Sequence, residues 1–171
     1  MLLSKKNVKS IKKNKVTFIK NFTQIENIYD FNKLSVLIDN YSLPVENKTN
    51  QLNTFNSIWQ LKNIHKLDSL FFTYIDFLQK IFKYNLTTKD GVDLFFSFVT
   101  NIGVSHADTE DVFLIGLYGN TIYRVIENNK DFILEKGDLL FVPKGTQHKA
   151  ISLTPRVVAS VGYFGGKLFN D

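Results

Sequence analysis

Residues 92–164 form a succession of short apolar segments separated by turns, and this feature constrains the fold more than any other in the chain. Turn sequences such as Tyr118-Gly-Asn and Asn128-Asn lie between the segments. Segments of this length at this spacing predict the strands of a compact all-β sandwich or barrel. The predicted strands span residues 92–99, 112–118, 121–127, 131–134, 138–142, 148–152 and 156–164.

The part of the chain before residue 91 has mainly helical periodicity. Residues 16–22 alternate weakly and predict a first strand, and Thr23 and Glu26 have the spacing of a capping box that begins a helix ending near Asn40. Residues 42–56 are polar and predict a loop. A second helix begins at Asp68, and its apolar stripe predicts packing against a sheet. The stripe consists of Leu70, Phe71, Tyr74, Leu78, Ile81 and Phe82.

Size and composition limit the possible classes of protein. A chain of 171 residues is expected to form one domain that needs neither disulfides nor a structural metal to fold. The absence of cysteine excludes thiolate zinc sites, cysteine nucleophiles and a disulfide scaffold. No apolar run is long enough for a membrane span, and the start of the chain does not resemble a signal peptide. We therefore expect a cytoplasmic protein.

The positive charge is concentrated at the start of the chain. Residues 1–20 hold seven lysines and no acid, and since the whole chain carries +5, the remaining residues together carry −2. A solvated basic leader is the commoner explanation of such a run, and contact with nucleic acid or an anionic surface is the alternative. The expected organisation is a basic leader at 1–20, a helical part at 21–90 packed on a barrel, and a metal-binding core at 91–171.

A motif with closely defined spacing lies near the end of the chain. Residues 137–152 read Gly-Asp-Leu-Leu-Phe-Val-Pro-Lys-Gly-Thr-Gln-His-Lys-Ala-Ile-Ser. Gly137 allows a positive φ after a turn, Pro143 ends the strand, and Gly145 redirects the chain so that His148 points inward. The stretch resembles the second cupin motif, G-x5-P-x-G-x2-H-x3-N, with every spacing kept and Ser152 in place of the final Asn.

A second motif lies upstream, where residues 103–119 read Gly-Val-Ser-His-Ala-Asp-Thr-Glu-Asp-Val-Phe-Leu-Ile-Gly-Leu-Tyr-Gly. On a strand, His106 and Asp108 share one face, so both side chains reach one ion. This stretch resembles the first metal-binding segment of the JmjC-like cupins, in which the H-x-H of simple cupins becomes H-x-D. The resemblance covers about residues 92–165.

The resemblance implies a double-stranded β-helix, or cupin jelly roll, with N-terminal helices on its outside. It further implies an Fe(II)- and 2-oxoglutarate-dependent dioxygenase that hydroxylates a C–H bond. His106, Asp108 and His148 would hold the iron, 2-oxoglutarate would chelate two further positions and O₂ would take the last. Two imidazoles and one carboxylate are the ligand set of such oxygenases. We expect Ser105, Ser152 or Ser160 to orient the imidazole rings through hydrogen bonds.

The residue that pairs with the distal carboxylate of 2-oxoglutarate is not at its usual place. Many relatives have a basic residue two positions after the glycine turn, where this chain has Thr121. Arg124 has the opposite strand parity and should face away from the pocket. Arg156 is the better candidate for pairing with the distal carboxylate of 2-oxoglutarate. The alternative interpretation is that Arg156 forms an ion pair at the surface, at the start of a strand. Thr121, Tyr123 and Lys144 are the further candidates.

Two functional classes stay open. The first is an oxygenase that acts on a small molecule or a peptide, and the second is a metal-binding cupin, or a non-catalytic jelly-roll module, that uses no 2-oxoglutarate. Fold analogy does not decide between them. The sequence is compatible with a homodimer and has no motif for reading nucleic acid. His65, in a lysine-rich segment with helical character, is expected at the surface.

Overall fold

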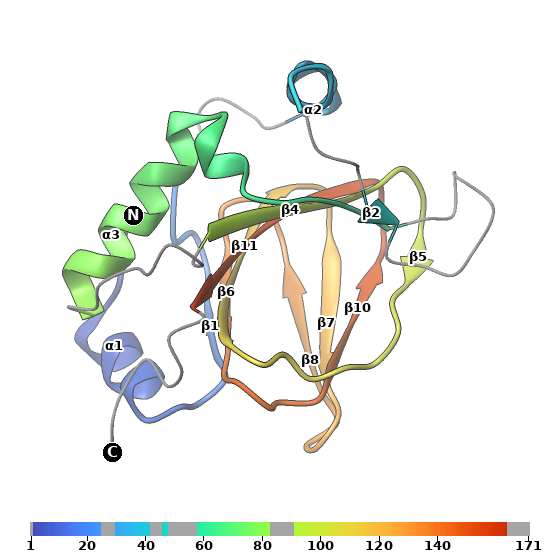
Figure 1. Ribbon diagram of the computed structural model, residues 1–171. Coiled ribbons are helices and arrows are strands. Elements are labelled where there is room, and N and C mark those ends of the chain that lie inside the picture. Colours follow the sequence, from blue (N-terminus) through green and yellow to red (C-terminus); the bar gives the residue numbers. More distant parts are fainter. Residues whose placement is uncertain (1, 25–29, 42–45, 48–57, 83–90, 164–171) are drawn as a thin grey trace.

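The computed structural model of the protein describes residues 2–24, 30–41, 46–47, 58–82 and 91–163 (Figure 1). Two antiparallel sheets form the centre of the molecule. The larger sheet has the strand order β1 (Thr17–Ile19), β9 (Leu139–Val142), β6 (Asp111–Tyr118), β11 (Arg156–Tyr163), β4 (Gly91–Ser97), β3 (Trp59–Leu61) and β2 (Glu46–Asn47). The smaller sheet has the order β5 (Asn101–Ile102), β10 (His148–Ser152), β7 (Thr121–Val125) and β8 (Lys130–Leu134).

These sheets confirm the predicted jelly roll. All seven predicted strand segments from residue 92 onward correspond to strands of the structure, with ends that differ by at most two residues. Val112 and Leu114 of β6 pack between the sheets against Tyr123 and Val125 of β7. The strand β7 alternates in burial because one of its faces looks into this space, whereas β6 and β9 are buried on both faces.

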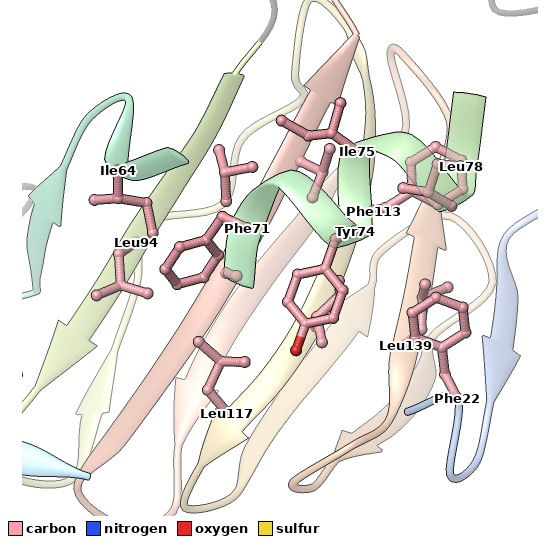
Figure 2. Close-up of a cluster of buried hydrophobic side chains, with 14 of the residues drawn as sticks. Phe22, Ile64, Phe71, Tyr74, Ile75, Leu78, Leu94, Phe113, Leu117 and Leu139 are labelled. Atoms are coloured by element: carbon pink, nitrogen blue, oxygen red, sulfur yellow. The ribbon is translucent and has the colours of Figure 1, made fainter. Parts of the chain in front are cut away.

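The second core lies on the outer face of the larger sheet, under α3 (Ser69–Phe82). Figure 2 shows Phe71, Tyr74 and Leu78 of α3 lying over the sheet beside Phe113 of β6. The predicted apolar stripe is therefore confirmed as a packing surface. The helix starts after Asp68, whose Oδ1 accepts a hydrogen bond from the backbone N–H of Leu70 at 2.8 Å.

The helix α2 (Phe31–Asp39) starts later than the capping-box spacing predicted. Asp30 is its N-cap and accepts a hydrogen bond from the backbone N–H of Lys33 at 3.0 Å. Thr23 instead donates its backbone N–H to the carbonyl of Gly137 at 3.1 Å, so it holds the chain against the β8–β9 turn. Glu26 lies outside the described residues. The predicted loop 42–56 contains β2, and its other residues also lie outside the described part.

The N-terminal segment is not the solvated leader that the lysines suggested. Residues Lys5–Lys12 form the helix α1, which Ser4 caps by accepting from the backbone N–H of Asn7 at 3.1 Å. Ile11 is fully buried in the core under α3. The following strand β1 pairs with β9. The division at residues 20 and 90 stays a proposal, since β1 and β3 lie in the same sheet as the strands of 91–171.

Among the described residues, no helix is long and apolar enough to cross a membrane.

Candidate metal centre

The two predicted histidine ligands face each other across a short antiparallel bridge. The backbone N–H of His106 donates to the carbonyl of His148 at 2.9 Å, and the reverse bond measures 2.8 Å. Asp108 lies just beyond this bridge, in a segment without strand pairing. Its carbonyl accepts from the backbone N–H of Gly145 at 3.0 Å. Gly145 has φ +79°, a left-handed conformation that a residue with a Cβ rarely adopts, so the predicted role of this glycine is confirmed.

The three side chains converge on one point. One ligand atom from each residue lies within 4.8 Å of those of the other two. The Nε2 atoms of His106 and His148 lie 3.4 and 3.6 Å from the two oxygens of the Asp108 carboxylate. The His148 side chain is 4% exposed and that of His106 is 55% exposed. The cluster is therefore closed on the His148 side and open to solvent on the other.

Backbone carbonyls, and not serines, orient the two rings. Nδ1 of His106 lies 3.0 Å from the carbonyl oxygen of Val104, and Nδ1 of His148 lies 2.9 Å from that of Thr146. In a neutral imidazole this contact places the proton on Nδ1 and leaves Nε2 free to bind a metal. The expectation for Ser105, Ser152 and Ser160 is wrong. Ser105 and Ser152 bond elsewhere, to Gln147 and Ser97, and Ser160 lines the cavity.

Electrostatics in the cluster favour a cation. A hydrogen bond to the Asp108 carboxylate raises the pKa of His106, and burial opposes this effect. Burial also raises the pKa of Glu110, where repulsion from Asp108 acts in the same direction. A cation placed beside Asp108 and Glu110 would offset this repulsion. Two imidazole nitrogens and one carboxylate fit a divalent metal that keeps open coordination positions.

The cluster lies at the wall of a cavity of about 600 Å³ between the two sheets. Deep in the cavity lies Arg156 at the start of β11, only 2% exposed. Its Nη1 lies 3.5 Å from Oγ1 of Thr121, and the nearby guanidinium opposes the rise in the pKa of Tyr123 that burial causes. Its Nε has no hydrogen-bond partner, and no carboxylate among the described residues forms an ion pair with it. The surface ion pair considered for Arg156 is therefore wrong.

Arg124 points the other way, as strand parity predicted. It forms two hydrogen bonds of 2.6 Å with the carboxylate of Asp131 on the outer face of the smaller sheet. Lys144, the last of the further candidates, is exposed and does not line the cavity.

The polar wall at the other end of the cavity was not predicted from the sequence. Asp93 of β4 accepts from the side chain of Gln60 and from the backbone N–H of Asn63. The Oε1 atom of Gln60 is buried without a partner. Asp93 is a charged residue within the apolar strand β4, at the position that pairs with Ser160 of β11. A carboxylate at such a position was the signal in the sequence for a polar wall. Gln60 gave no signal because β3 was not predicted.

The third histidine does not belong to the cluster, but it is not a surface residue as predicted. His65, in the 3₁₀-helix η2 (Ile64–Lys66), is half-buried. Its Nδ1 accepts a hydrogen bond from the backbone N–H of Val92 at 3.2 Å, and its ring packs edge-on against Phe72. Burial lowers the pKa of this histidine.

Comparison with known proteins agrees with this geometry. Residues 121–169 match the family model of the JmjC domain, a segment that includes Thr121, Tyr123, His148 and Arg156. A search of curated protein sequences gave no significant match.

Solved structures of the ribosomal oxygenase YcfD from Escherichia coli share the fold. One crystal structure aligns over 98% of this chain and 53% of its own, with 16% identity and a TM-score of 0.73. The complex of YcfD with cobalt and 2-oxoglutarate aligns over 90% of this chain and 49% of its own, with 17% identity and a TM-score of 0.68. The chain thus spans about half the length of these structures. The expected resemblance is confirmed by the JmjC domain match of residues 121–169, and the fold is shared with YcfD.

Proposed function

We propose that the protein is an Fe(II)- and 2-oxoglutarate-dependent dioxygenase that hydroxylates a substrate bound in the cavity between the sheets. One observation carries the proposal. Three ligand atoms within 4.8 Å of one another open onto a cavity that also holds a buried arginine with no carboxylate partner among the described residues.

His106, Asp108 and His148 would hold the iron. When bound, Fe(II) supplies the redox chemistry that couples decarboxylation of 2-oxoglutarate by O₂ to hydroxylation of a C–H bond. The part of the protein is to present two neutral Nε2 atoms and one carboxylate in a fixed arrangement. Buried His148 shields the inner side of the site from water, and the exposed side of His106 leaves access for the substrate.

Arg156 would bind the distal carboxylate of 2-oxoglutarate. A buried guanidinium without a carboxylate is costly, and a bound dicarboxylate removes that cost through charge-assisted hydrogen bonds. The small side chain of Thr121 leaves room at the position where many relatives have a basic residue, and Arg156 reaches this place from β11. Tyr123 would support the same carboxylate through its hydroxyl.

The polar wall at the other end of the cavity would meet the substrate. The unpaired Oε1 of Gln60 and the nearby carboxylates of Asp93 and Glu110 are acceptors. A substrate that fits them carries hydrogen-bond donors, as a peptide side chain or a small metabolite can. The similar protein YcfD is a ribosomal oxygenase, which favours a macromolecular substrate over a small metabolite. For location we propose the cytoplasm, because a chain without cysteine fits a reducing compartment.

An anaerobic titration with Fe(II), with and without 2-oxoglutarate, tests the proposal. We expect the weak visible charge-transfer band of the chelate only when both are present. Replacing Arg156 by Met should lower 2-oxoglutarate affinity about ten- to a hundredfold while Fe(II) binding is kept, because a charge-assisted bidentate contact is lost. Arg124→Met removes the only other arginine, on the outer face, and should change neither affinity.

The alternative function is that of a metal-binding cupin without 2-oxoglutarate, which Thr121 at the usual basic position favours. A turnover assay distinguishes the oxygenase from the metal-binding cupin. With Fe(II), ascorbate and O₂, the oxygenase should slowly convert 2-oxoglutarate to succinate even without its substrate, above the rate of free iron, and His148→Ala should not. Bound metal with neither 2-oxoglutarate binding nor succinate formation would establish the alternative.

A further inference from the structure

The helix α1 presents a continuous face of lysines. At 3.6 residues per turn, Lys5, Lys9 and Lys12 form one stripe and Lys6 and Lys13 form the next. All five are exposed. We call these five residues the lysine face. The opposite side of the helix is anchored in the molecule by Ile11, which is fully buried.

The lysine face has no acidic counterpart of its own. None of its lysines forms an ion pair with any residue in the described part of the chain, whereas Lys20, Lys33 and Lys80 do. The sequence has no acid before residue 26. The positive charge is thus held together on one folded element and is available to an external anion.

A shallow groove of about 580 Å³ runs beside the lysine face. Its apolar lining comes from Leu3, Val8 and, on the neighbouring helix α3, Ile81, and its charged lining from lysines of the face. A groove with an aliphatic floor and a cationic border accommodates a ligand that has both an apolar surface and repeated negative charges.

We propose that the lysine face and this groove bind single-stranded nucleic acid. Lysine side chains neutralise successive phosphates of the backbone, and an unpaired base has an apolar face to place against the aliphatic floor. A duplex keeps its bases stacked inside and offers this floor little. Binding here is separate from the proposed chemistry, because α1 lies beside α3 on the outer side of the larger sheet, away from β7 and β10 (Figure 1).

The alternative partner, an anionic membrane, fits the helix less well. A helix that lies in a membrane interface inserts an exposed apolar face among the lipids. The apolar residues of α1, Val8 and Ile11, pack against the protein core instead. The exposed residues of α1 are all lysines, and the aliphatic floor of the groove consists of partly buried side chains beside them.

The binding of a fluorescein-labelled oligouridylate of about twelve nucleotides, followed by anisotropy with the 171-residue chain, tests the proposal. If five lysines each neutralise one phosphate, affinity should fall about a hundredfold between about 50 and 200 mM salt, with a logarithmic slope of about −3.5. The triple variant Lys5→Gln, Lys9→Gln, Lys12→Gln should bind more weakly and reduce the slope to about −1.4.

A matched variant, Lys66→Gln, Lys130→Gln, Lys149→Gln, removes the same net charge elsewhere and should keep the slope of the wild type. Thermal unfolding checks that both variants fold. An equal loss of affinity in the two variants overturns the proposal, because it would mean that net charge alone attracts the RNA. The absence of RNA binding at low salt overturns the proposal as well. A protein that sediments with phosphatidylserine vesicles but does not bind RNA would also overturn it.

Discussion

At the scale of single residues, the metal centre is the most directly testable feature. His106→Ala or Asp108→Ala should abolish stoichiometric binding of Fe(II) or Mn(II), because each removes one of the three candidate ligands in the described part of the chain. Both variants should still unfold cooperatively, since the buried clusters under α3 and between the sheets do not include these two side chains. Anaerobic calorimetry measures the stoichiometry.

The third histidine provides the control for that experiment. His65→Gln removes an imidazole outside the cluster and should leave one metal bound with wild-type affinity. If purified His106→Ala still binds one metal with unchanged affinity, the assignment of the site is wrong.

The spacing of the two motifs predicted the convergence of His106, Asp108 and His148. The expected strand parity of His106 and Asp108 is not the reason, because Asp108 lies outside the strands. The sequence did not decide whether Arg156 is buried, because burial depends on the strands that pair beside it. Nor did it predict that the carbonyls of Val104 and Thr146 orient the rings. That contact follows from the register between two segments far apart in the sequence.

At the scale of elements, the contact between His65 of η2 and Val92 of β4 should make the free energy of unfolding depend on pH. The pKa of His65 is lowered in the folded protein, and its neutral Nδ1 accepts from Val92. As pH falls below about 6.5, the unfolded chain takes up the proton first, so the free energy of unfolding decreases until the folded ring is protonated too.

Urea unfolding at about pH 7.5 and 5.5 measures this effect. His65→Gln keeps an acceptor for Val92 but does not titrate, so it should lose less stability between these two values than the wild type. An identical loss in both proteins would show that His65 does not contribute to the pH dependence.

The packing of α3 on the larger sheet gives a second prediction for an element. Leu78 is fully buried between the helix and the sheet (Figure 2), so Leu78→Ala should lower the free energy of unfolding by about 2–5 kcal/mol. Val36→Ala on α2 is the control, since Val36 is 59% exposed and its truncation should cost about 0.5 kcal/mol or less. Denaturant midpoints at a constant slope give both values. Equal losses would contradict the packing described.

Helices and strands long enough to show a hydrophobic pattern were predicted from the sequence. Short strands, and elements whose position depends on tertiary packing, were not. The helix α3 and the strand β7 bury one face over several residues, which leaves a periodic pattern in the sequence, and β6 and β9 are buried on both faces, which leaves continuous apolar runs. The strands β3 and β5 are three and two residues long, too short for a pattern. The helix α1 was hidden by its lysines, because only Ile11 of its eight residues is fully inside the core.

At the scale of the whole molecule, the fold should be independent of the metal while its stability responds to it. Both buried clusters are complete without any ligand, so the protein in EDTA should unfold in one cooperative transition. A ligand that binds only the folded state at about a hundred times its Kd adds about 2.7 kcal/mol. In a chain of 171 residues this corresponds to a rise in Tm of about 5–10 °C.

Mn(II), which does not start turnover, should therefore raise the Tm of the wild type and leave that of Asp108→Ala unchanged. Adding 2-oxoglutarate should give a second increase only when the metal is present, because in the proposed complex the co-substrate would bind to the metal as well as to Arg156. In Arg156→Met the first increase should remain and the second should shrink, since its guanidinium contact is gone. A second increase of wild-type size in Arg156→Met would place the 2-oxoglutarate carboxylate elsewhere, whereas no increase with Mn(II) in the wild type would contradict the metal centre itself.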